Sequence, residues 1–196
     1  MTFYPPDAPV PEGLRAAEFL LRPLRESDAA LDHDAVMDSR ALLLSRSMGQ
    51  WPREGFTLAE NAADLRHHER EHRERVAFTY TVMAPDETRC LGCVYINPLS
   101  HLLDRYNVPQ AGRMGSWQEE PVTTFWVRPD AVERELDARL VAALRAWFRD
   151  EWAFPRMLYG VNRNQTRNIE TLERVGLRRL DRFDAAGEPF EVYVYA

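Results

Sequence analysis

Short apolar runs and longer segments of mixed polarity alternate along this chain, and they predict strands and helices in turn. The runs that predict strands are Phe19–Leu24, Phe78–Met83, Cys90–Ile96, Val122–Val127, Met157–Val161, Leu177–Arg182 and Pro189–Tyr195. The segments that predict helices are Ala29–Leu44, Thr57–Arg75, Leu136–Phe148 and Ile169–Val175. This order predicts an α/β (mixed α+β) domain, with a mixed sheet of six or seven strands and helices on both faces.

The order strand, helix, strand, helix between Val122 and Leu177 is the most informative part of the pattern. It predicts that the strands Val122–Val127 and Met157–Val161 are parallel and central. Such a unit brings the N-terminus of a helix beside the end of a strand, where an anionic cofactor can bind.

Local signals support several of these elements. Thr57 and Glu60 have the spacing of a capping box at the start of a charged helix. An apolar stripe along the helix at 136–148 predicts that this helix packs on the core. Gly92, inside a strand, predicts a bulge or the close approach of another group.

Length and proline content suggest how the chain is divided. The 196 residues fit one domain. Residues 1–17 include Pro5, Pro6, Pro9 and Pro11, which predicts an irregular arm ahead of a single domain at 18–196. The stretch Ser100–Glu120 is a long connection, and long loops within a domain are usually functional or mobile.

Charge and composition narrow the class of function. The net charge of −6 and the pI near 5.4 argue against nucleic-acid binding and suit a cationic substrate. All 25 basic residues are arginine, which we interpret as a genome-composition bias. The absence of a membrane-length apolar run or an export signal, together with only two cysteines, predicts a cytoplasmic protein with no membrane association.

Two short motifs offer other chemistry. His68-Glu-Arg-Glu-His72 matches the H-E-x-x-H signature of zinc hydrolases. Its surroundings look polar on every side and no third ligand follows at a usable spacing, so we expect a solvated surface helix and no metal. Cys90 and Cys93 have C-x-x-C spacing, but in a strand they face opposite ways, which predicts buried structural cysteines.

The sequence Phe125-Trp-Val-Arg-Pro129 before the long helix, with Asn164-x-x-x-Asn168-Ile-x-x-Leu-Glu-x-x-Gly-Leu177 later, resembles the GNAT N-acetyltransferases. The similarity is greatest to the ribosomal-protein alanine acetyltransferase branch and covers roughly residue 18 to the C-terminus. It implies the GNAT fold, in which the sheet splays between its two central parallel strands.

The resemblance also implies where acetyl-CoA would bind. The pyrophosphate loop of the family aligns with Val132–Asp137, where Glu135 and Asp137 stand at the positions of two glycines and Glu133 adds a third acid. These acids oppose an anion, and Arg134 and Arg139 partly offset them. The other cofactor-binding residues that the resemblance implies are Phe125, Trp126, Val127, Arg128, Asn164 and Asn168.

For the acceptor side, the resemblance implies an acidic group that deprotonates the amine. The family position is Val122 here, and Glu120 lies two residues earlier on the same strand face, so Glu120 is the predicted catalytic base. Trp51 and Trp117 lie in loops, where exposed aromatic residues often form a binding wall, and they are predicted substrate contacts.

The predicted function is therefore an acyl-CoA-dependent N-acyltransferase, most simply an acetyltransferase, acting on a small-molecule or peptide amine. The amine would attack the thioester directly, with backbone N–H groups of Trp126 to Arg128 holding the acyl carbonyl. A homodimer is possible. Two alternatives stay open: a non-catalytic GNAT-fold binding protein that has lost acetyl-CoA binding, and, more remotely, the zinc hydrolase.

Overall fold

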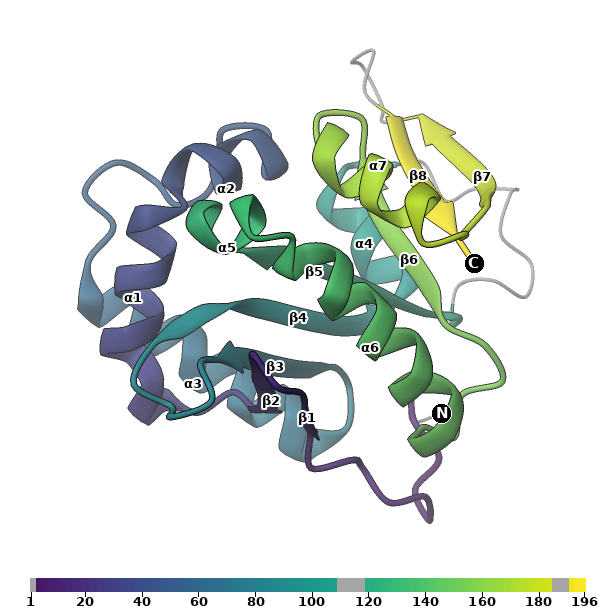
Figure 1. Ribbon diagram of the computed structural model, residues 1–196, viewed down its shortest axis with the longest axis horizontal. Helices are drawn as coiled ribbons and strands as arrows, with labels where there is room; N and C mark the ends of the chain where they lie inside the picture. Colours follow the sequence, from purple (N-terminus) through teal and green to yellow (C-terminus); the bar gives the residue numbers. More distant parts are fainter. Residues whose placement is uncertain (1–2, 109–118, 185–190) are drawn as a thin grey trace.

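The computed structural model describes residues 3–108, 119–184 and 191–196 (Figure 1). Within these residues eight strands form one sheet, in the order β1-β2-β3-β4-β5-β6-β8-β7. The strands are β1 (Leu14–Arg15), β2 (Leu20–Pro23), β3 (Phe78–Met83), β4 (Cys90–Pro98), β5 (Pro121–Val127), β6 (Leu158–Asn162), β7 (Arg179–Asp184) and β8 (Glu191–Tyr195). Neighbouring strands are antiparallel except for β5 and β6, which are parallel as the sequence predicts.

The described helices cover both faces of this sheet, which confirms the predicted fold class. They are the 3-10 turn η1 (Glu26–Asp28), α1 (Ala29–Asp38), α2 (Arg40–Arg46), α3 (Leu58–Glu74), α4 (Leu99–Arg105), α5 (Pro129–Glu133), α6 (Leu136–Glu151) and α7 (Thr166–Arg174). Helix α6 crosses one face, and α7 packs on the same side through Leu172 (Figure 1). Helices α1 to α4 lie against the other face.

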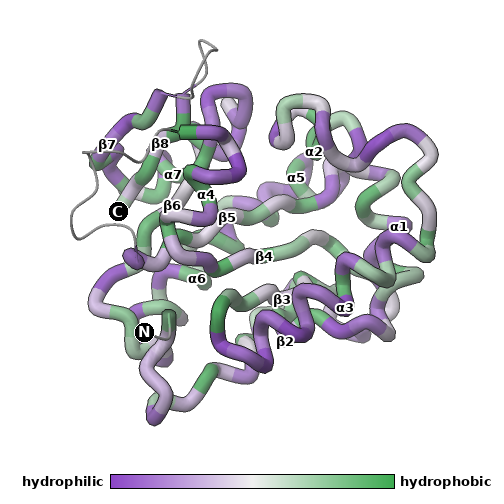
Figure 2. Tube along the Cα trace, turned by 180° about the vertical axis from the view of Figure 1, so that it is seen from behind, coloured by the Kyte–Doolittle hydropathy of each residue, from purple (hydrophilic) through white to green (hydrophobic). Residues whose placement is uncertain are grey.

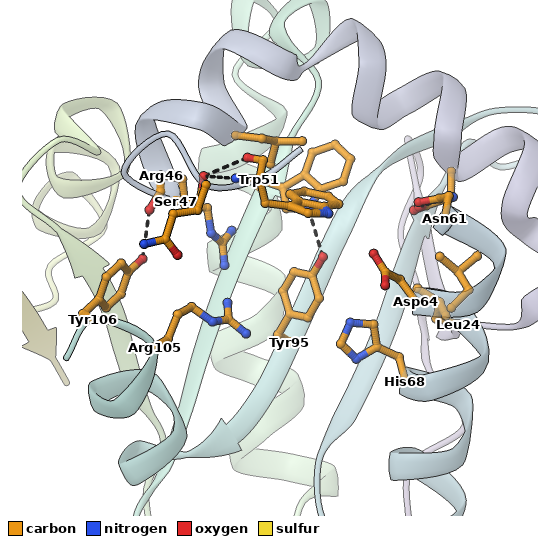
Figure 3. Close-up of a pocket in the computed structure, with 15 residues that line it drawn as sticks. Leu24, Arg46, Ser47, Trp51, Asn61, Asp64, His68, Tyr95, Arg105 and Tyr106 are labelled. Carbon is orange, nitrogen blue, oxygen red and sulfur yellow. Dashed lines mark hydrogen bonds between the residues drawn. The ribbon is translucent and has the colours of Figure 1, made fainter. Parts of the chain in front are cut away.

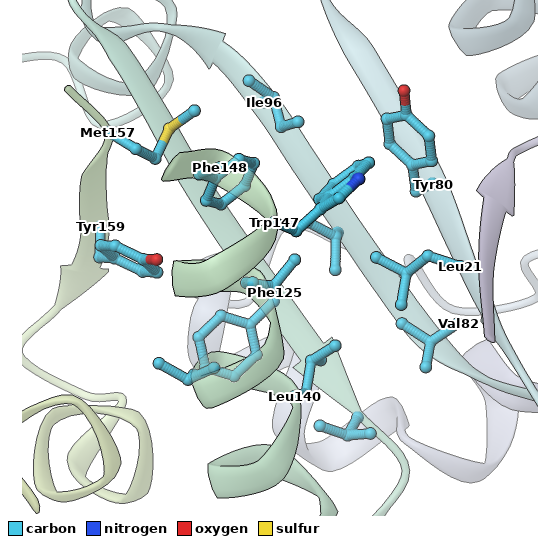
Figure 4. Close-up of a cluster of buried hydrophobic side chains, with 14 of the residues drawn as sticks. Leu21, Tyr80, Val82, Ile96, Phe125, Leu140, Trp147, Phe148, Met157 and Tyr159 are labelled. Carbon is cyan, nitrogen blue, oxygen red and sulfur yellow. The ribbon is translucent and has the colours of Figure 1, made fainter. Parts of the chain in front are cut away.

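The largest part of the core lies beneath α6, as its apolar stripe predicts. Leu140, Trp147 and Phe148 point from α6 onto the sheet, where they meet side chains such as Phe125 and Tyr80 (Figure 4). Tyr80 and Trp147 pack edge to face with ring centres 5.0 Å apart. Burial of these large side chains away from water is the main force that holds α6 on the sheet.

Helix α3 differs from its predicted environment. It is largely hydrophilic along its length (Figure 2), and Thr57 and Glu60 form the predicted capping box at its start. It is not solvated on every side, however, because Asn61 and Leu65 are buried against α1 and the sheet. The hydrophilic sequence conceals this packing because the buried face contains few apolar side chains.

Three further details differ from the predicted elements. The helix predicted from Ala29 to Leu44 is interrupted at Ser39, which divides it into α1 and α2. Part of the predicted connection Ser100–Glu120 is helical, because α4 begins directly after Pro98. The sheet has one or two strands more than expected, since the two-residue β1 pairs with β2.

The N-terminal arm packs against the domain that follows it. Tyr4 is fully buried in the core, and Tyr80 donates a hydrogen bond from its hydroxyl to the carbonyl of Pro11, at 2.6 Å. Arg75 donates to the carbonyl oxygens of three residues of the arm. The division at residue 18 stays a prediction. None of the described helices is both long enough and apolar enough to span a membrane.

Candidate functional site

The parallel strands β5 and β6 part after a short pairing, and this opening organises the site. They pair only at Val122 with Leu158 and at Thr123 with Tyr159, although β5 continues to Val127 and β6 to Asn162. Beyond Thr123 the two strands therefore splay apart. The splay predicted between the central parallel strands is present.

Backbone groups of β5 face this opening. The amide of Arg128 donates to the carbonyl of Leu91 on the β4 side, at 2.8 Å, whereas the carbonyl of Phe125 accepts from Asn168 Nδ2 on the other side, at 3.3 Å. Because backbone groups alternate in direction along a strand, the N–H groups of Phe125 and Val127 point toward the opening. Of the predicted donors to an acyl carbonyl, Val127 fits, while Trp126 and Arg128 direct their N–H groups toward β4.

The side chain of Arg128 is also engaged within the protein. It is buried, donates from Nε to the carbonyl of Cys90 at 2.7 Å, and forms ion pairs with Asp34 and Asp38. These contacts attach α1 to β4 and β5. The guanidinium therefore holds two elements together, and cofactor contact by its side chain stays a prediction without geometric support.

The N-terminus of α6 lies beside the end of β5, but side chains from α7 contact it. Arg167 donates to both carboxylate oxygens of Asp137, at 2.7 and 3.1 Å, and Thr171 Oγ1 donates to the same carboxylate at 2.8 Å. Although burial opposes ionisation, the hydrogen bonds from Arg167 and Thr171 hold the pKa of Asp137 below its ordinary value. Arg174 pairs with Glu135 at 2.7 Å.

The backbone at this turn nevertheless has the shape that glycine favours. Glu135 adopts a left-handed conformation with φ of 59° and precedes the first residue of α6. The first N–H groups of α6 have no acceptor within the helix, as at any helix start. The turn thus retains a glycine-like conformation, while its acidic side chains form ion pairs with arginines of α7.

Arg134 and Arg139 lie on the opposite side of α6 from these contacts. Arg139 pairs with Glu18 and donates to the carbonyl of Arg134, and both arginines line a cavity of about 180 Å³ with Arg89. Their prediction as cofactor contacts is untested. Glu18 and Leu91 also line this cavity, which places the two arginines on the β2–β4 side of the turn.

A larger cavity, of about 360 Å³, opens on the sheet face that carries α1 to α4 (Figure 3). Trp126 and Tyr95 form its floor, and Trp126 Nε1 donates to the Tyr95 hydroxyl at 3.3 Å. Trp51, a predicted substrate contact, lines it together with Arg46 of α2 and His68 of α3. We call this cavity the α1–α4 pocket.

One end of the α1–α4 pocket is acidic. Asp32 is 3% exposed and accepts from Asn61 Nδ2 at 3.0 Å, while Asp64 lies exposed at the rim. Burial raises the pKa of Asp32 above its ordinary value, and the hydrogen bond from Asn61 only partly opposes this. His68 lies beside these acids, with its ring centre 5.6 Å from that of Tyr95.

The other end is basic and lies where β5 and β6 part. Arg46 is 7% exposed, and its Nη2 donates to Thr124 Oγ1 at 2.6 Å. The Arg46 carbonyl accepts from Asn162 Nδ2 of β6 at 2.7 Å and from the Tyr106 hydroxyl at 3.1 Å. Arg46 therefore contacts both central strands and links the pocket to the opening between them.

Glu120 lies at the far end of β5. It precedes the paired residues of β5 and receives two hydrogen bonds from Arg156, at 3.0 and 3.1 Å. Five residues separate it from Phe125, which is about 17 Å along a strand. Its role as base stays a prediction that the geometry does not favour, because the strands are still paired at that end.

The remaining predicted residues fall in different places. Asn168 reaches across the opening to β5, as described above, whereas Asn164 is exposed and contributes its backbone N–H to Asn162 Oδ1 at 3.0 Å. Gln165, the N-cap of α7, accepts from the amide of Asn162. Trp117 lies outside the described residues. Sequence reasoning missed Arg46 and Asp32, which lie in helices with no recognisable motif.

The two cysteines are buried and free, as predicted, but they do not face opposite ways. Cys93 Sγ lies 3.5 Å and Cys90 Sγ 3.9 Å from the same Asp32 oxygen. The pairing of β3 with β4 shifts by one residue between Gly92 and Cys90, so a bulge reverses the alternation between them. Gly92 permits this, since a Cβ there would lie 2.0 Å from the Trp126 carbonyl oxygen.

The H-E-x-x-H residues do not converge on a metal site. His72 packs edge-on against Phe78, with ring centres 5.1 Å apart, whereas His68 Nδ1 contacts Glu71 at 3.0 Å. Across the part of the chain that the structure describes, no three His, Cys, Asp or Glu side chains are grouped to hold a metal ion.

Solved structures with the same architecture are known, although no protein-family model and no curated protein matches the sequence. The ribosomal-protein-S5-alanine acetyltransferase from Vibrio fischeri superposes with a TM-score of 0.67 at 14% identity, over 93% of this chain and 94% of that one. The microcin C7 self-immunity acetyltransferase MccE, in complex with acetyl-CoA and AMP, gives 0.71 at 10% identity, over 95% and 96%. A GNAT-family acetyltransferase from Bacillus anthracis gives 0.62 at 15% identity, over 93% and 96%.

These likenesses define the class of fold. The chain has the GNAT acetyltransferase fold over more than nine tenths of its length, as the sequence resemblance implies.

Proposed function

We propose that this protein is an acyl-CoA-dependent N-acyltransferase that acts on a primary amine. The observation that carries the proposal is the opening between β5 and β6, which begins at Thr124 and adjoins the α1–α4 pocket through Arg46. An extended acyl-CoA arm would lie in the opening and bond to backbone groups of Phe125 and Val127. The amine would approach from the pocket. Support also comes from MccE, a neighbour solved with acetyl-CoA.

The chemistry needs an acidic group near the amine rather than at the closed end of β5. Asp32 is buried in the pocket wall and contacts Cys93, which pairs with Trp126 of β5. Burial raises the pKa of Asp32 toward neutral pH, and a general base works best when its pKa lies near the pH at which the enzyme operates. We therefore assign proton acceptance to Asp32. In direct transfer, a bond forms between the amine nitrogen and the acyl carbon while Asp32 takes a proton from that nitrogen. The carbon–sulfur bond breaks, and CoA leaves as a thiolate that takes up one proton, so that the net products are the amide and the CoA thiol.

The pyrophosphate of the cofactor would lie at the turn before α6. The backbone of this turn has a conformation that suits an anion, but its acidic side chains repel one. The left-handed Glu135 and the start of α6 provide the geometry for an anion. Asp137 and Glu135 already engage Arg167 and Arg174. Binding therefore requires these two arginines to exchange carboxylates for phosphate oxygens.

The test is acetyl transfer from acetyl-CoA to a panel of primary amines. The rate is measured from the release of the CoA thiol. Native protein is expected to release thiol in an amine-dependent manner, and Asp32→Asn is expected to lower kcat by about 10²-fold or more, as removal of a general base does. Arg149→Gln, on the exposed face of α6, is the matched control and should retain full activity. Thiol release that does not depend on added amine would count against the proposal.

The second candidate is the non-catalytic GNAT-fold binding protein. The closure of the α6 N-terminus by Asp137, Arg167 and Thr171 favours it, because an internal carboxylate takes the contacts that a phosphate would make. It predicts no binding of acetyl-CoA at millimolar concentration. Binding of a small ligand in the α1–α4 pocket would remain under this alternative.

A further inference from the structure

Arg46 is a buried cation with no carboxylate partner among the described residues. Among the described residues, its side chain donates one hydrogen bond, from Nη2 to Thr124, and Nη1 is buried without a hydrogen-bond partner there. The guanidinium also lies over the Tyr95 ring, with Cζ 5.4 Å from the ring centre. Burial of an unpaired charge is costly, so this arrangement is unfavourable until an anion joins it.

The α1–α4 pocket places a second cation beside the first. Arg105, at the end of α4, lines the pocket on the same side of Tyr95 as Arg46, and both side chains point into the cavity (Figure 3). Two guanidinium groups that converge on one space match the bidentate geometry of a carboxylate or phosphate. The unsatisfied Nη1 of Arg46 supplies a buried donor for such an anion.

The acidic end of the same pocket suits an ammonium group. Asp64 and His68 lie on the other side of Tyr95 from the two arginines (Figure 3). Arg46 Cζ and the His68 ring centre lie 5.4 and 5.6 Å from the Tyr95 ring centre, so they are at most about 11 Å apart. A ligand that spans both ends is therefore small.

The strand register gives a second measure of the separation. Arg46 contacts Thr124, and Asp32 contacts Cys93, which pairs with Trp126. Thr124 and Trp126 are two residues apart on one face of β5, or about 6–7 Å along the strand. An anionic group and an amine joined by a few bonds fit this separation.

We propose that the acceptor is a small molecule that carries an anionic group, carboxylate or phosphate, close to the amine that is acylated. Arg46 and Arg105 bind the anion, and the amine faces Asp32 and the opening between β5 and β6. The assignment of this amine as the acylated group rests on the proposed function, whereas binding of the anion to the pocket does not. An internal peptide segment or an uncharged amine would leave Arg46 unpaired.

The first experiment measures binding without acetyl-CoA, so its result is independent of catalysis. Isothermal titration would compare matched probes: γ-aminobutyrate with butylamine, glycine with glycinamide, and O-phosphoethanolamine with ethanolamine. At least one anionic member is expected to bind about tenfold or more tightly than its neutral partner. The pairs also separate carboxylate from phosphate. Equal affinity within every pair would overturn the proposal. So would the absence of binding by any anionic member at about 10 mM, a concentration that detects ligands with millimolar Kd.

The second experiment assigns the preference to Arg46. Arg46→Gln is expected to abolish the difference between paired probes, Arg46→Lys to restore part of it, and Arg105→Gln to reduce it. Arg149→Gln should leave it unchanged. Circular dichroism of each variant confirms the fold. A preference that survives both Arg46→Gln and Arg105→Gln would refute the assigned site. Anion binding that persists without any acetyl transfer would contradict the proposed function and leave the anion site standing.

Discussion

The unpaired guanidinium of Arg46 makes an unusual prediction about stability. Arg46→Met removes a buried charge and retains much of the apolar side-chain volume. We expect the free energy of unfolding in urea to stay unchanged or to rise by up to about 2 kcal/mol, because the desolvation cost exceeds one hydrogen bond to Thr124. A loss of more than about 1 kcal/mol relative to the Arg149→Met control would show that Arg46 serves the fold.

Asp32 predicts a pH dependence whose sign follows from its burial. Burial raises the pKa of Asp32 in the folded protein, so between the unfolded value near 3.9 and the folded value the native state holds a proton that the unfolded chain lacks. Stability is therefore lost as pH rises through this window. Asp32→Asn should match the native protein near pH 4 and become the more stable of the two toward neutral pH.

The measurement is chemical unfolding from about pH 4 to pH 8, with the two proteins compared at each pH. His68, Cys90 and Cys93 surround Asp32 and are the same in both proteins, so the difference between the two proteins reports the Asp32 carboxyl. Asp64→Asn, at the exposed rim of the same pocket, is the control and should follow the native curve. A difference that is constant across this range would mean that Asp32 is ionised throughout.

At the scale of single residues, the sequence predicts only part of the α1–α4 pocket. Trp51 could be predicted because an aromatic residue in a loop between two helices is conspicuous. Arg46 is one arginine among 25, and nothing in its local pattern shows that it is buried. Glu120 is predicted from the base position that the family resemblance implies and from strand parity, and neither reveals its ion pair with Arg156 or the end of β5 at which the opening lies.

At the scale of elements, two acids at the start of α6, Glu135 and Asp137, look equivalent in the sequence but differ in backbone conformation and burial. Glu135 is left-handed and exposed, so Glu135→Gly relieves backbone strain of about 1 kcal/mol and loses an exposed ion pair worth at most about 1 kcal/mol. We expect little change in the free energy of unfolding. Asp137→Gly breaks a part-buried ion pair with Arg167 and a buried hydrogen bond with Thr171, and it should cost about 3 kcal/mol.

The same pair of substitutions tests whether these acids oppose the cofactor. The double variant frees Arg167 and Arg174 and removes two negative charges, so its affinity for acetyl-CoA, measured by titration calorimetry, should exceed that of the native protein. Glu151→Gly, an exposed acid at the opposite end of α6, is the matched control. Equal affinities would show that the acids do not obstruct binding.

Other elements show why local patterns succeed or fail. The capping box at Thr57 and the stripe on α6 depend on residues a few positions apart, so the sequence contains the whole signal. The cysteine pair depends on how β4 pairs with β3, because the bulge near Gly92 is a property of two strands. Helix α4 was missed although Leu99, Leu102 and Leu103 have helical spacing, because its seven residues are too few for that period to stand out.

For the whole molecule, the order of elements predicts a mixed sheet with a central parallel pair, and the family resemblance implies the GNAT fold. Only a few chain paths join a strand, a helix and a parallel strand, and the right-handed crossover restricts them further. The opening between β5 and β6 is what the family resemblance implies, and the short pairing of the two strands shows it. The pocket could not be predicted, because helices α1 to α4 contribute its walls from distant parts of the sequence.

The central claim is that an acyl-CoA binds in the opening between β5 and β6, and thermal unfolding with acetyl-CoA tests it most directly. Ligand at a hundred times its Kd should stabilise the fold by about 2.7 kcal/mol, which for a chain of this length is a rise of about 5–10 °C in Tm. Acetyl phosphate at the same concentration is the control and should leave Tm unchanged. A Tm that does not move with millimolar acetyl-CoA would contradict the account.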